Sequence, residues 1–214
     1  MANINGAFGL RPIANVGQNS NSTGVSGYTQ YEIASGNSNV IYFGTPVIPL
    51  STGYIDVVGA AAGGTVGLLG SFMGCKYVAS TTGKPTWSNY WPGSGADSNH
   101  PVEAWVADDP MQIFVIATDA SWTSKATARA AVFANANFSS GTSGSTTTGM
   151  SSGALAISTI AATKTLNVRI LGWEDDPASS DFASSGIGAV VRLNNHFNSA
   201  NGAIVAGTTD SAGV

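Results

Sequence analysis

The sequence predicts a mainly β protein: an antiparallel β-barrel or sandwich with one short helix and long loops, possibly divided into two β lobes. Short runs rich in β-branched and aromatic residues recur at roughly ten-residue spacing, separated by Gly, Pro, Asn, Asp or Ser. Residues 70–119 contain three of these runs and three of the five tryptophans, so the largest apolar side chains gather there. The 214-residue chain is long enough to bury a core.

The first half is expected to contain an arm and a domain. Residues 1–20 predict an extended N-terminal arm, because Arg11-Pro12 disfavours helix and a polar, linker-like run follows. Residues 21–120 predict a β-barrel or sandwich domain. Its expected strands are 27–33, 40–43, 46–50, 54–58, 65–69, 71–78, 102–107 and 111–118. The long loop at 79–101 is expected to be ordered, with its own aromatic anchors. These anchors are Trp87, Tyr90 and Trp91.

Residues 121–214 are expected to form a second β-rich lobe. The Ala-rich stretch 124–135 has apolar residues at helical spacing and predicts the short helix, capped by Thr123 or Ser124. Residues 139–153 are rich in Ser, Gly and Thr and predict a loop with little to bury. Strands are then expected at 154–157, 165–173 and 188–194, before a polar tail.

The composition excludes several classes of function. Charged residues make up 9% of the chain and the net charge is −4, whereas soluble domains usually carry about a quarter charged residues. A surface of neutral hydroxyls and amides suits tight subunit packing, since few charges need desolvating. Basic residues occur singly, which argues against direct nucleic-acid binding. No run reaches the ~18–20 apolar residues of a membrane span, and no signal-peptide pattern is present, so a soluble protein is expected.

Some residues match catalytic motifs, but each has a simpler structural interpretation. Residues 149–153 fit the G-x-S-x-G nucleophile pattern at Ser151, yet they lie in a Ser/Thr/Gly-rich loop rather than between a strand and a helix. The bases that such a hydrolase needs, His100 and His196, are placed like hydrogen-bonding loop histidines. The only cysteine, Cys75, is expected to be a buried small hydrophobe.

The acidic turns at 108–109 and 174–176 could bind calcium or supply the carboxylates of a glycoside hydrolase. Solvated turn carboxylates explain them more simply, because no calcium-loop motif is present. No catalytic residue, metal ligand or cofactor is therefore expected.

A family resemblance rests on turns and strand cores spread over most of the chain. The stretches are Phe8–Pro12, Gly70–Val78, Gly83–Pro85 leading to Ser88–Pro92, Ala104–Pro110 with Phe114, Leu166–Leu171, and Val191–His196. In these stretches the chain resembles tailed-bacteriophage virion proteins of the capsid decoration, or cement, type. The resemblance implies a non-enzymatic structural protein on the outside of an icosahedral head. Such proteins commonly bind as trimers and reinforce the joints between capsomers.

The partners implied by this resemblance are the major capsid protein and further copies of the chain. The first candidates for capsid contact are the arm residues Phe8, Leu10, Arg11 and Ile13, with Arg11 pairing a capsid carboxylate. Two alternatives stay open. A head-fibre or tail-associated receptor binder would grip glycan with the aromatic residues at 87–91. A carbohydrate-active enzyme would use the acidic turns.

Overall fold

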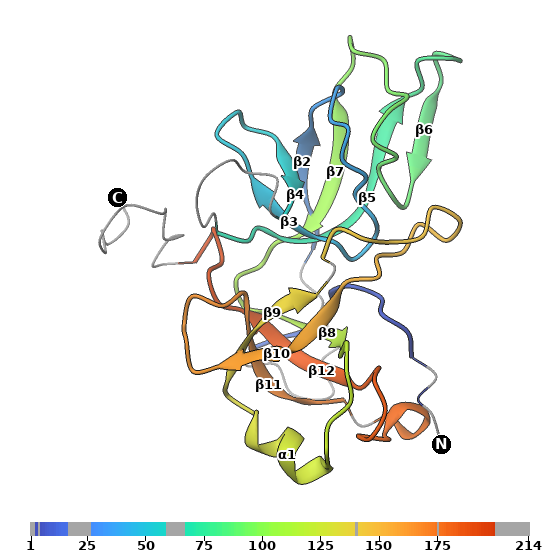
Figure 1. The fold of residues 1–214 in the computed structure, drawn as a ribbon. Coiled ribbons are helices and arrows are strands. Elements are labelled where there is room, and N and C mark those ends of the chain that lie inside the picture. The colour runs from blue at the N-terminus through green and yellow to red at the C-terminus, as the bar shows by residue number, and fades with distance from the viewer. Residues whose placement is uncertain are drawn as a thin grey trace.

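The computed structural model describes residues 3, 5–16, 27–58, 67–139, 141–174 and 176–199. Its strands form two halves, one above the other in Figure 1. The lower sheet has the order β1-β8-β12-β11-β9-β10, and the upper sheet has the order β2-β7-β5-β3-β4 with β6 beside β5. Both sheets are antiparallel, and the described residues form no closed barrel. The predicted mainly β class with one short α-helix is confirmed.

The strand bounds are as follows. The lower sheet consists of β1 (Arg11–Asn15), β8 (Gln112–Ala117), β9 (Asn135–Ser139), β10 (Ala154–Ala161), β11 (Val168–Trp173) and β12 (Gly188–Leu193). The upper sheet consists of β2 (Thr29–Ile33), β3 (Pro46–Pro49), β4 (Ile55–Val57), β5 (Gly70–Val78), β6 (Pro85–Ser88) and β7 (Val102–Ala107).

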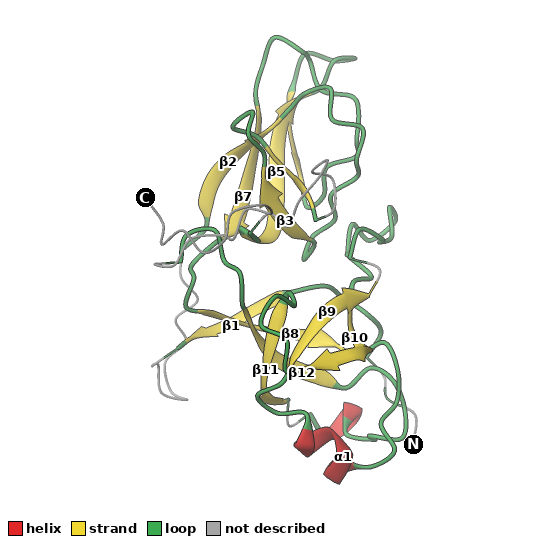
Figure 2. Ribbon diagram, turned by 60° about the vertical axis from the view of Figure 1, so that its left-hand side comes forward, coloured by secondary structure: helices red, strands yellow, loops and turns green. Residues whose placement is uncertain are grey.

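The helix α1 (Lys125–Ala130) lies at the bottom of the lower half in Figure 2. The Ser124 hydroxyl caps it by accepting a hydrogen bond from the Thr127 N–H at 3.2 Å. It is shorter than the predicted 124–135, because the Phe133 N–H donates to the Ile170 carbonyl of β11 at 2.8 Å instead of continuing the helix. A short 3-10 helix, η1 (Pro177–Ser179), precedes β12.

Three predicted segments differ from the structure. The predicted strand 40–43 forms only isolated bridges, from Ile41 to Trp91 and from Phe43 to Met150. The predicted loop 79–101 contains β6, which pairs with β5. Of the predicted strand 65–69, residues 65–66 lie outside the described residues, and Leu68 forms an isolated bridge with His196.

The strand pairing also divides the chain differently from the expected boundary at residue 120. Strand β8 belongs to the lower sheet, where it lies between β1 and β12. Phe114 and Ile116 face the lower core, and Val115 on the opposite face is also fully buried. A strand that is apolar on both faces favours an interior position in a sheet, and β8 has one between β1 and β12. Of the predicted arm 1–20, residues 11–15 form β1, which pairs with β8 of the same chain.

The two halves share apolar packing. The upper core gathers around Phe72 and Trp91, and the lower core around Phe114 and Leu155. Three buried side chains from the segments of the upper half pack into the lower core. They are Ile48, Leu68 and Ala107. The halves are therefore joined by a continuous apolar contact rather than by a linker alone.

The N-terminal segment joins the halves through its backbone. The Gly9 N–H donates to the Gly153 carbonyl at 3.0 Å, and the Leu10 N–H donates to the Gly44 carbonyl at 2.8 Å. The Leu10 carbonyl accepts from the Ser71 hydroxyl at 2.7 Å. Gly9 has φ +74°, and a Cβ there would overlap the Gly44 backbone, so this close approach requires glycine.

The burial of Leu10 gives the first prediction. Replacing Leu10 with Ala should lower the free energy of unfolding by about 2–5 kcal/mol, because the side chain is fully buried in the lower core. The exposed Ile13 on the same segment is the matched control, and Ile13→Ala should change stability by less than about 0.5 kcal/mol. Denaturant unfolding measures both. Equal, small effects would mean that the N-terminal segment is a detachable arm.

Candidate functional site

The four predicted capsid-contact residues do not share one surface. Leu10 is fully buried, so it is not available to a partner. Phe8 is half-buried, with the Arg11 guanidinium 4.7 Å from its ring centre. Arg11 and Ile13 are exposed, and the closest carboxylate oxygen recorded for Arg11 is that of Glu174, at 3.9 Å. The structure thus leaves Arg11 and Ile13 as accessible members of the predicted set.

Two further exposed apolar residues lie beside Ile13. Val16 follows β1, and its N–H donates to the Met111 carbonyl at 2.9 Å, so both residues extend the β1–β8 edge. All three side chains are exposed by more than a third. We call Ile13, Val16 and Met111 the edge strip. The sequence placed Val16 in an arm and Met111 in another strand, and only the antiparallel register brings them together.

The three predicted aromatic anchors have three different environments. Trp91 is fully buried, and its indole N–H donates to the Asn37 carbonyl at 3.2 Å. Tyr90 is half-buried and stacks on Tyr42, with ring centres 5.9 Å apart. Trp87 is 68% exposed. Only Trp87 therefore presents a large free aromatic surface to a partner.

Trp87 stacks on Trp105, a residue that the sequence did not single out as a site. Trp87 lies on β6 and Trp105 on β7, on either side of β5, with ring centres 5.2 Å apart and planes at 16°. Gly74, at φ +124° in a bulge of β5, has no side chain between the indoles. A shallow hollow of about 270 Å³ adjoins the pair, lined by Met73, Gly74, Ser88 and Asn89, among others.

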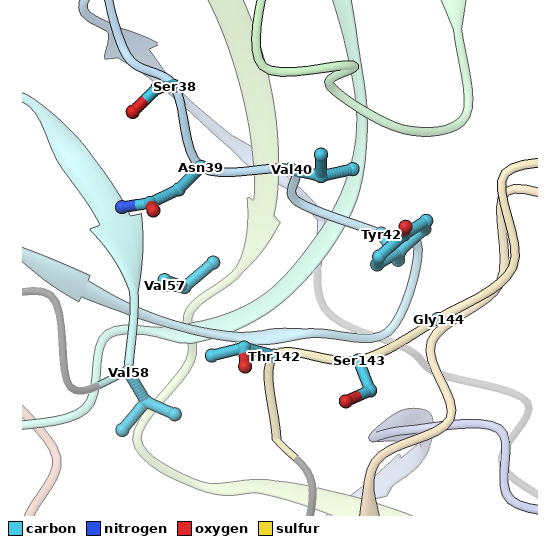
Figure 3. Close-up of a pocket in the computed structure, with 9 residues that line it drawn as sticks. All are labelled: Ser38, Asn39, Val40, Tyr42, Val57, Val58, Thr142, Ser143 and Gly144. Atoms are coloured by element: carbon cyan, nitrogen blue, oxygen red, sulfur yellow. The ribbon is translucent and has the colours of Figure 1, made fainter.

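A larger hollow of about 610 Å³ lies at the junction of the two halves (Figure 3). Its walls combine aliphatic and tyrosine side chains of the upper half with the loop that follows β9. The lining residues are Ser38, Asn39, Val40, Tyr42, Val57, Val58, Thr142, Ser143 and Gly144. None of these described residues is Asp, Glu, His, Lys or Arg, so the hollow offers no acid–base pair of the kind a hydrolase uses.

Ser151, at the nucleophile position of the G-x-S-x-G pattern, makes hydrogen bonds inside the protein. Ser151 is buried, and its hydroxyl accepts from the Gly153 N–H at 3.0 Å and donates to the Ser143 carbonyl at 3.4 Å. Neither histidine is recorded as its partner, since His100 contacts Asp97 at 3.1 Å and His196 accepts from the Asn198 N–H. The structure does not bring together the parts of a triad in the described residues.

The acidic turn at 108–109 is held by donors of the chain. Asp108 accepts hydrogen bonds from the Thr29 hydroxyl at 2.8 Å and the Tyr31 hydroxyl at 2.6 Å. Burial, followed by this hydrogen bond, raises the pKa of Tyr31 to about 12. Asp109 accepts from the Asn15 amide at 2.9 Å. Asp175 lies outside the described residues.

The described residues contain neither a metal-binding cluster nor a membrane-spanning helix. Within the described ranges, no group of three or more His, Cys, Asp or Glu is placed to hold a metal ion. No helix in the same ranges is long and apolar enough to cross a membrane. Cys75 is buried, as its sequence context predicted, and burial raises the pKa of its thiol to about 12.

Comparisons with known proteins found no matching family model, curated protein or solved structure.

The buried His196 gives the second prediction. Burial is the main cause that lowers its pKa from 6.5; Arg192 adds to this, while Asp108 and Asp109 act in the opposite direction. The unfolded state then binds the proton more readily. The stability from neutral His196 is fully present above about pH 6.5 and is lost as the pH falls towards the folded-state pKa.

Unfolding free energies measured across this pH range should decrease with acidification in the wild-type chain. The decrease should be smaller in a His196→Gln variant, which lacks the buried imidazole. An identical pH dependence in the wild type and His196→Gln would contradict the prediction.

Proposed function

We propose that this chain is a capsid decoration protein of a tailed bacteriophage, located on the outside of the virion. In this role it binds the major capsid protein and stabilises capsomer junctions without catalysis, as a homo-oligomer and with a trimer as the expected state. The proposal is supported by the charge-poor composition and by the family resemblance. The use of candidate nucleophiles and acids in internal hydrogen bonds also favours a structural role over an enzymatic one.

The observation that carries the proposal is the edge strip beside Arg11. Strand β1 is at the edge of the lower sheet, and Ile13, Val16 and Met111 expose apolar side chains there. An exposed apolar sheet edge invites association. A capsid surface that covers the strip and offers a carboxylate to Arg11 would bury this apolar area, and Arg suits such pairing through its planar, multidentate guanidinium.

The third prediction tests this contact by substitution rather than by deletion. Removing residues 1–14 would also remove Leu10 from the core, so lost binding would report misfolding. Ile13→Asp should instead reduce occupancy on DNA-filled heads that lack the protein, by about tenfold or more, because it places a charge in an apolar contact. Gel densitometry of sedimented heads measures occupancy.

The matched control is Tyr54→Asp. Tyr54 is exposed to nearly the same degree as Ile13, at 36% against 38%, and lies before β4 in the upper half. Heads that retain full occupancy with Ile13→Asp, at unchanged protein stability, would exclude the edge strip as the capsid contact. Wild-type protein that does not bind heads would exclude the proposed function itself.

A second candidate function is glycan binding by a receptor-binding virion protein. It is favoured by the exposed Trp87 beside a hollow with polar Ser88 and Asn89, since sugar rings pack on aromatic faces while their hydroxyls need hydrogen-bonding partners.

The fourth prediction follows from this alternative. If Trp87 holds a sugar, glycan-array binding should be abolished in Trp87→Ala and retained in Tyr54→Ala, which removes another exposed aromatic ring. An array on which the wild-type chain shows no signal would remove glycan binding from consideration.

A further inference from the structure

The face of the lower sheet that is turned away from the lower core carries two arginines directly opposite each other. Arg169 on β11 is in register with Arg192 on β12, and Arg192 is in register with Ile113 on β8. The adjacent Val168 and Val191 face the lower core, so these three side chains lie on the other face. Like charges placed opposite each other destabilise a sheet. No ion pair is recorded for either arginine among the described residues.

An exposed aromatic residue lies beside β11, one of the strands that carry the arginine row, which we define as Arg169, Arg192 and Ile113. Phe133 lies beside β11, because its N–H donates to the Ile170 carbonyl at 2.8 Å. Its side chain is 75% exposed and its φ is +73°, a conformation that is unfavourable for a bulky residue. Both features cost free energy in the isolated chain, and burial against a partner would offset them.

On the outward face of the upper sheet, two acidic residues lie opposite each other. Glu32 on β2 is in register with Glu103 on β7, Glu103 with Lys76 on β5, and Lys76 with Trp87 on β6. Lys76 binds Glu103 at 3.1 Å. Glu32 is exposed, and no ion pair is recorded for it among the described residues. We call these four residues the glutamate row. It ends in the exposed ring of Trp87.

We propose that the arginine row of one copy binds the glutamate row of a second copy of the same chain. Each row places like charges opposite each other, and the signs of the two rows are complementary. Association would pair Glu32 with an arginine and bring aromatic side chains into contact with guanidinium groups, which stack on indole rings. Arginine and aromatic residues are also the types enriched in the centres of protein interfaces.

The two rows are different surfaces of one molecule, which restricts the assembly. A single contact between them is heterologous and leaves one free row of each kind, so repetition gives a ring or a chain, whereas a two-fold dimer would make the contact twice. The contact involves only copies of this protein. It is therefore independent of whether the edge strip binds a capsid.

The test uses two variants of the full chain, each with one row altered. Arg169→Glu with Arg192→Glu reverses the arginine row, and Glu32→Arg alters the glutamate row. The wild type should show a light-scattering mass of at least twice the 21.6 kDa chain mass, decreasing as salt rises because surface charges are screened. Each variant alone should dissociate, with its association constant lowered by about tenfold or more.

Mixing the two variants is the decisive measurement. The first variant keeps an intact glutamate row and the second an intact arginine row, and the reversed charges of the two altered rows are also complementary, so the mixture should regain a mass of at least two chains. Lys84→Glu with Lys125→Glu is the control, because it changes the net charge as much as the double arginine reversal at exposed lysines outside both rows.

Circular dichroism and thermal unfolding must show that all variants are folded. Three results would overturn the proposal: a wild-type mass of one chain at low salt, association that is unaffected by either row variant, or a mixture that contains only single chains. A complex in the mixture, absent from each variant alone, would establish the pairing of these two faces.

Discussion

The contact on which the structure depends is the junction of Gly9 and Leu10 with both halves of the molecule. Their two N–H groups donate to the carbonyls of Gly153 and Gly44, and the Leu10 carbonyl accepts from Ser71. Buried backbone groups of this kind are costly to leave without partners. The close approach also needs a residue without Cβ at position 9. The segment that the sequence predicts as an extended arm therefore holds the two sheets together.

This junction determines which N-terminal side chains are accessible to a partner. Leu10 is used inside the protein, and the strand that follows it pairs with β8 on one side only. Arg11 and Ile13 remain exposed, and the register adds Val16 and Met111 to the same edge. The proposed partner contact at this edge and the stability of the fold would then depend on different residues of one short segment, so substitutions can separate the two.

The sequence predicted the strand-rich class because strand and turn preferences are local. It could not predict that β8 joins the lower sheet, since this depends on pairing with strands near both ends of the chain. It also grouped Trp87 with Trp91, although one is exposed and the other fully buried. Alternation along β6 and the bridge from Trp91 to Ile41 decide these environments. Likewise, Arg169 and Arg192 are far apart in sequence, and only the register of β11 and β12 makes them neighbours.

Because the chain contains few charged residues, the arginine row and the glutamate row largely determine the charge of the faces on which they lie. With 9% charged residues, most of the surface is neutral, so few neighbouring charges compensate the opposed arginines. Of the opposed glutamates, Glu103 is paired with Lys76. The shared packing of Ile48, Leu68 and Ala107 into the lower core ties the two sheets together, and with them the directions in which both rows face. Because those directions are fixed by the fold, the proposed contact between the rows would also fix the angle between successive copies, and that angle would decide whether repeated contacts close into a ring.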